Sequence, residues 1–78
     1  MNTIPLNEIN TNEDVTVVNI NNSPISNKLT EMGIYKGKTI SIQFKAPLGD
    51  PIAIEINGCL LSLRISEAKL IQVKRTQL

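Results

Sequence analysis

The sequence of 78 residues contains no histidine and a single cysteine, Cys59. An internal disulfide is therefore impossible, and a zinc cluster of cysteine and histidine ligands is disfavoured. Without histidine, no nucleophile has the usual general base beside it, so we expect no enzyme. The segment from Gly33 to Thr39 does not match the G-x-x-x-x-G-K-S/T pattern of a phosphate-binding loop. The residues thus imply no catalytic centre, no metal site and no cofactor.

Aromatic residues and excess charge are also scarce. Tyr35 and Phe44 are the only aromatics, and the net charge of +1 arises from interspersed signs. This argues against electrostatic binding to nucleic acid or anionic lipid. No apolar run approaches the roughly 18 residues that span a bilayer, and the N-terminus lacks the pattern of a signal peptide. We expect a cytoplasmic protein without direct membrane insertion.

A β-hairpin gives the strongest local pattern. Asn57-Gly58 lies between two alternating apolar runs and predicts a type I′ turn, because both residues tolerate positive φ. The resulting register places six side chains on one face: Ile52, Ile54, Ile56, Cys59, Leu61 and Leu63. Cys59 is then expected to be a small buried residue rather than a redox or iron ligand.

A short helix is predicted over residues 24–32. Ser23 suits the N-cap, and Pro24 suits the first helical position, where its missing N–H is no loss. Gly33 suits the position after the helix, where a Schellman ending needs left-handed φ.

Three further strands are predicted, over 15–20, 38–45 and 70–74. The adjacent Val17-Val18 breaks the alternation of the first, which indicates a bulge or a strand covered on both faces. A turn ending at Gly37 precedes the second strand, whose alternation points Phe44 inward.

The predicted order of elements favours a small, mainly β domain. Ser66 is expected to cap a helical turn over 66–69, between the hairpin and the last strand. Five short strands from so few residues hide one apolar face best by curling into a barrel, which also removes exposed edges. We therefore expect a single domain over 1–78, a five-stranded SH3-like barrel with frayed ends at 1–5 and 75–78.

Several segments together resemble the FeoA family: Met32-Gly33-Ile34 with Gly37, A-P-L-G-D-P-I at 46–52, Gly58, L-S-L-R at 61–64, Glu67-Ala68, and Ile71 with Val73. The resemblance covers about residues 4–74. It implies an SH3-like barrel and a small cytosolic accessory protein of bacterial ferrous iron uptake. It also implies a partner, the cytoplasmic part of FeoB, a membrane transporter with a GTP-binding domain.

The turn formed by Pro47, Leu48, Gly49, Asp50 and Pro51 is the first candidate contact site. Two interpretations stay open. The geometry of a tight turn alone could require these residues, or Leu48 could be an apolar anchor that a rigid turn presents to a partner.

Arg64 is the second candidate. The hairpin register places it opposite Pro51 and near Asp50. It is expected either to hold the turn closed by a charge-assisted hydrogen bond to Asp50 or to face the partner. The acidic residues Glu8, Glu13 and Asp14 are expected to form an ordinary solvated surface.

Two other functions remain as alternatives. Small barrels also bind RNA, but such a function requires stacking aromatics on the sheet and a basic groove. The barrel also occurs as the regulatory domain of DtxR-type metal-dependent repressors. There it is attached to a DNA-binding helix-turn-helix, for which residues 1–23 leave no room.

Overall fold

The computed structural model describes residues 2–76, which form one antiparallel sheet with short helical segments. The strands are β1 (Ile4–Pro5), β2 (Asp14–Ile20), β3 (Thr39–Lys45), β4 (Ile52–Ile56), β5 (Cys59–Leu63) and β6 (Ile71–Arg75). The helices are the 3-10 turn η1 (Leu6–Glu8), α1 (Ser26–Glu31) and α2 (Ile65–Ala68). The mainly β class is confirmed, with six strands in place of the five expected.

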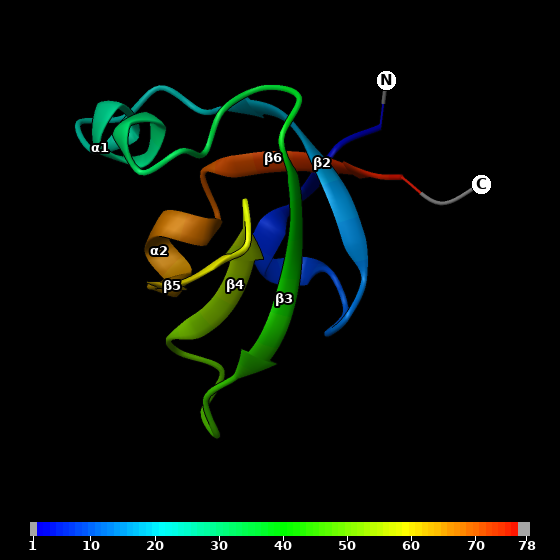
Figure 1. The fold of residues 1–78 in the computed structure, drawn as a ribbon. Helices are drawn as coiled ribbons and strands as arrows, with labels where there is room; N and C mark the ends of the chain where they lie inside the picture. The colour runs from blue at the N-terminus through cyan, green and yellow to red at the C-terminus, as the bar shows by residue number, and fades with distance from the viewer. Residues whose placement is uncertain (1, 77–78) are drawn as a thin grey trace.

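The sheet curls around an aliphatic core, in the order β1-β6-β2-β3-β4-β5 (Figure 1). Every strand from β2 to β6 contributes buried side chains, and Leu6, Leu29 and Ala68 add one each from η1, α1 and α2. Within residues 2–76, β1 and β5 do not pair with each other. The barrel is therefore open at these two edges, whereas the sequence predicted closure.

The β4–β5 hairpin has the predicted register, with Ile54 opposite Leu61. Asn57 and Gly58 both have positive φ, 55° and 79°, as a type I′ turn requires. The prediction for Cys59 was wrong, because its thiol is exposed. Cys59 lies beside the hairpin turn on a strand that pairs on one side only, so no neighbouring element covers it. Leu61 is half-buried for the same reason.

Helix α1 ends as predicted and begins later than predicted. The N–H of Ile34 donates to the carbonyl of Leu29 at 3.1 Å, and Gly33, with φ of 99°, donates to Thr30. These two bonds form a Schellman ending. The first helical residue is Ser26, because Ser23 forms a turn in which its Oγ accepts the N–H of Ile25.

Two bulges interrupt the alternation of the strands. The pairing of β2 with β6 shifts between Val17 and Asn19, which confirms the predicted irregularity. The pairing of β3 with β4 shifts between Ile42 and Phe44, which the sequence did not predict. The extra residue turns the next side chain to the opposite face, so Phe44 points outward and is 59% exposed. The expectation that Phe44 joins the core was wrong.

The segments near the ends are more ordered than expected. Ile4 pairs with Val73, and Arg75 belongs to β6, so neither Ile4–Pro5 nor Arg75 is frayed. Residues 1, 77 and 78, also expected to be frayed, lie outside the described residues. Helix α2 begins before Ser66: the Glu67 carboxylate accepts the N–H of Arg64 at 2.8 Å, and this bond caps the helix.

The core assignment predicts the effect of two leucine truncations. Leu29→Ala should lower the free energy of unfolding by about 2–5 kcal/mol, because it leaves a cavity at a fully buried position. Leu60→Ala removes the same atoms from a side chain that is 66% exposed. It should change the free energy of unfolding by less than about 0.5 kcal/mol. Urea denaturation measures both, and equal losses would contradict the assignment.

Candidate partner-binding site

The loop between β3 and β4 projects from the sheet at the end of the molecule away from α1 (Figure 1). The N–H of Gly49 donates to the carbonyl of Ala46, and Gly49 has φ of 86°, which a side chain would oppose. Pro47 supplies the fixed φ at the second position of this turn. Leu48 is left at the tip, 96% exposed. The loop thus holds an apolar side chain where another molecule can reach it.

Asp50 holds this loop to the start of α2. Its carboxylate accepts the backbone N–H of Ile65 at 3.1 Å. The predicted hydrogen bond between Asp50 and Arg64 is not formed, because the carboxylate bonds the main chain instead. Among residues 2–76, no hydrogen bond or ion pair engages the Arg64 guanidinium. Of the two interpretations for Arg64, the loop-closing one is therefore wrong.

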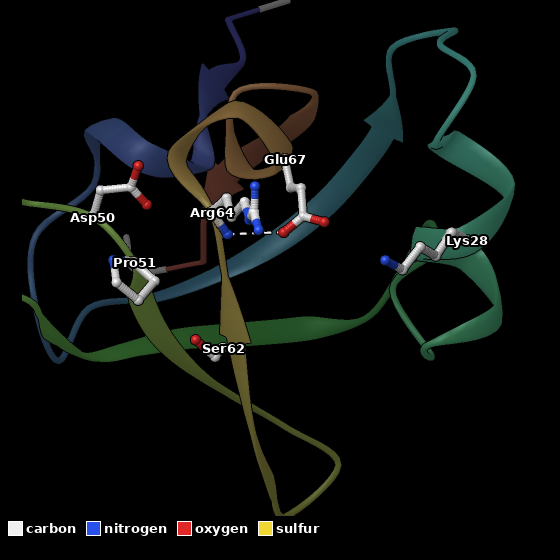
Figure 2. A pocket seen from close by; sticks show the side chains of 6 residues that line it. All are labelled: Lys28, Asp50, Pro51, Ser62, Arg64 and Glu67. Carbon is white, nitrogen blue, oxygen red and sulfur yellow. Dashed lines mark hydrogen bonds between the residues drawn. The ribbon is translucent and has the colours of Figure 1, made fainter.

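An open, polar hollow of about 550 Å³ lies at this end of the hairpin. Its lining residues are Lys28, Asp50, Pro51, Ser62, Arg64 and Glu67. Figure 2 shows Asp50 and Pro51 on one side and Lys28 of α1 on the other, with Ser62, Arg64 and Glu67 between them. Both carboxylates accept backbone N–H groups, whereas the two cations have no hydrogen-bond or ionic partner among residues 2–76.

A second, apolar hollow of about 340 Å³ adjoins the first, since Pro51 and Ser62 line both. Phe44, Ala53 and Leu60 line it on the outer face of β3, β4 and β5, and its other lining residues are Ala46, Pro51, Leu61 and Ser62. Sequence reasoning missed this surface because it placed Phe44 in the core. The one pattern that could have indicated it is Leu60, an apolar residue on the face of β5 that the register assigns to solvent.

The other predicted residues occupy structural positions. Gly37 has φ of 93° in the turn before β3, and its N–H donates to the carbonyl of Val17. Glu13 forms an ion pair with Arg75 and accepts the N–H of Asn10, so it tethers the first loop. In the part of the chain that the structure describes, no group of three or more acidic, cysteine or histidine side chains could hold a metal ion.

Comparison with known proteins gives a consistent result. The family model for the FeoA domain matches residues 4–75. A fusion protein of Fe(2+) transport protein A and the Fe(2+) transporter FeoB, from Porphyromonas gingivalis, is 34% identical over 70 residues. These residues are 88% of this chain and 8% of that relative's length.

Solved structures agree with the family match. A FeoA-like protein from Clostridium acetobutylicum is 43% identical, with a TM-score of 0.93 over 100% of this chain and 92% of that one. The zinc complex of Stenotrophomonas maltophilia FeoA, described as an SH3 domain protein, is 29% identical, with a TM-score of 0.79 over 95% and 91%. A manganese-dependent repressor shares the fold alone, at 17% identity and a TM-score of 0.88 over 96% of this chain and 37% of that one.

No helix among the described residues is long and apolar enough to cross a membrane.

The contacts of Asp50 and Arg64 predict different roles in stability. Asp50→Ala should lower the free energy of unfolding by about 1 kcal/mol, because it removes the acceptor for the Ile65 N–H. Arg64→Ala should change the free energy of unfolding by less than about 0.5 kcal/mol, because its guanidinium has no hydrogen-bond or ionic partner among residues 2–76. Urea denaturation measures both, with the exposed Glu31→Ala as a control. A larger loss for Arg64→Ala than for Asp50→Ala would contradict this description.

Proposed function

The protein belongs to the FeoA family, and we propose that it is a cytoplasmic accessory protein of ferrous iron uptake that binds the cytoplasmic part of a FeoB-type transporter. In this role it catalyses no reaction itself. The observation that carries the proposal is the fusion of the two proteins in the Porphyromonas gingivalis relative, where one polypeptide contains both. A fusion holds two domains at high effective concentration, which is useful when they act on each other.

The exposed loop at 46–51 supports a role in contact with another protein. Leu48 is an apolar side chain that the domain leaves in water, and a turn that includes Pro47 and Gly49 holds it in place. A preorganised contact loses little conformational entropy on binding, so more of the free energy gained by burying the side chain contributes to affinity. We therefore assign the first transporter contact to Pro47, Leu48, Gly49, Asp50 and Pro51, with Arg64 beside them.

The effect on the transporter would be a shift in population. A protein that binds one state of the nucleotide domain more tightly than the other stabilises that state by the difference in binding free energy. Such an effect needs no catalytic group on the accessory protein, in keeping with a chain that contains no histidine.

Binding to RNA is a second candidate that one observation favours: Phe44 is exposed on the sheet, where a base could stack. Its neighbours in the apolar hollow, Ala53 and Leu60, do not offer the positive charge that a nucleic-acid backbone needs. The surface fits a protein better than RNA. Binding to single-stranded RNA that weakens steeply with salt would reverse this preference.

A binding experiment with the purified cytoplasmic part of the FeoB-type transporter tests the proposal. The wild-type protein is expected to bind it, and to keep most of its affinity at moderate salt, because the contact at Leu48 is apolar. Leu48→Ala should weaken binding by about tenfold, the loss expected for a central apolar anchor. Fluorescence anisotropy, with each nucleotide state of the transporter in turn, measures the affinity.

Tyr35→Ala is the matched control, because it truncates another exposed hydrophobic side chain, in the turn that follows α1. It should leave the affinity unchanged. If no nucleotide state of the transporter binds the protein, and its GTP turnover is unaffected, the proposed function is wrong.

A further inference from the structure

The two edges of the sheet differ in how they are protected. Strand β1 has two residues, one of them Pro5, which cannot donate a backbone hydrogen bond. Strand β5 has five residues and contains no proline, no charge and no bulge. Natural sheets normally protect a long edge by charge, proline or irregular backbone, because an open edge pairs with other chains. The unprotected edge of β5 therefore indicates an interface.

The free backbone groups of this edge can be assigned from the register. In a two-residue hairpin the residues flanking the turn, Ile56 and Cys59, exchange both backbone hydrogen bonds. The pattern alternates along the strand, so the N–H and C=O groups of Leu60 and Ser62 point away from β4. Within residues 2–76, no backbone hydrogen bond from a loop or helix engages either residue.

The side chains beside this edge form a surface with an apolar part and a polar part, and the polar part contains two cations and two carboxylates. Leu60 and Phe44 lie in the apolar hollow, and the polar hollow continues from Ser62 toward Arg64. Lys28 extends from α1 toward the same space (Figure 2). Among the described residues, neither the Lys28 ammonium nor the Arg64 guanidinium has a hydrogen-bonding or ionic partner.

We propose that β5 binds an extended segment of a partner protein as a seventh strand, with an apolar side chain against Phe44 and Leu60 and a carboxylate side chain between Arg64 and Lys28. This inference rests on the proposed function, and assigns the segment to the cytoplasmic part of the FeoB-type transporter. Main-chain bonds to Leu60 and Ser62 supply affinity, and the two side-chain sites supply specificity. A carboxylate beside Arg64 and Lys28 forms charge-assisted hydrogen bonds with two groups that have no partner among residues 2–76.

A second copy of this chain fits the site less well. Two β5 strands paired antiparallel about Leu61 would place Gly58 of one copy opposite Arg64 of the other. The neighbouring residue of that turn is Asn57, which carries no negative charge. Self-pairing would thus offer Arg64 and Lys28 no charged acceptor, whereas an acidic segment brings a carboxylate to them.

The test uses fluorescent 12-residue peptides that tile the cytoplasmic part of the transporter, titrated against the full-length protein. At least one peptide with an acidic residue is expected to bind. N-methylation of alternate residues in that peptide should abolish binding at the positions whose N–H faces β5, and leave it nearly unchanged at the positions between them. This alternation is specific to strand addition and requires no change in the protein.

Two pairs of variants test the site from the protein side. Ser62→Pro should abolish peptide binding because it removes the outward N–H. Ser62→Ala keeps that N–H and should bind normally. Urea denaturation checks that both variants fold.

Arg64→Ala should weaken binding by about tenfold. Replacing the acidic residue of the peptide by its amide should remove the difference in affinity between Arg64→Ala and wild type. Lys69→Ala, on the far end of α2 and outside both hollows, is the control.

The outcomes separate this inference from the proposed function. If the intact cytoplasmic part binds but its affinity is the same for Ser62→Pro and wild type, strand addition is wrong and the proposed function stands. If the intact part does not bind at all, both are wrong. Sedimentation that shows a dimer dissolved by Ser62→Pro would assign β5 to a second copy of this chain and overturn the inference.

Discussion

The pairing of β4 with β5 through the Asn57–Gly58 turn is the constraint on which the rest of the structure depends. Because both turn residues adopt positive φ, the two strands meet without an inserted residue, and their register is fixed. A shift by one residue would move Ile54 out of the core and a polar side chain into it. The same register brings the end of β5 beside the start of β4, where Asp50 reaches the Ile65 N–H.

That single hydrogen bond joins the loop at 46–51 to the junction of β5 and α2, which is 15 residues away in sequence. The loop at 46–51, the end of β5 and the start of α2 lie together because Asp50 and Glu67 each satisfy a backbone N–H there. Both carboxylates are thereby engaged with the main chain. Among residues 2–76 the Arg64 guanidinium in the same space has no hydrogen-bond or ionic partner, so the two capped N–H groups do not depend on it.

The bulge in β3 is the second feature with consequences for function. By shifting the alternation after Ile42, it moves Phe44 from the expected core position to the outer face of the sheet. The core is aliphatic and does not include this ring. Leu6 and Ile9, which precede β2, are fully buried in it. The ring then adds to the apolar surface beside β5, where Phe44 and Leu60 are exposed to water.

The sequence alone determined the features that depend on neighbouring residues. Positive φ at Asn57 and Gly58, the helix ending at Gly33 and the turn around Leu48 follow from local backbone preferences, which tertiary contacts did not override. The family resemblance rests in part on these features, through Gly33, Gly58 and residues 46–52.

Tertiary structure decided which side of each strand is covered. Cys59 has the pattern of a core residue, yet it is exposed because β5 has a neighbour on one side only. The bulge that reverses Phe44 is a shift in the pairing of β3 with β4, and the alternation of residues within β3 does not encode that pairing. The carboxylate of Asp50 prefers a distant backbone N–H to the predicted guanidinium. Burial and hydrogen-bond partners depend on what the rest of the chain brings nearby, so a single strand's pattern cannot fix them.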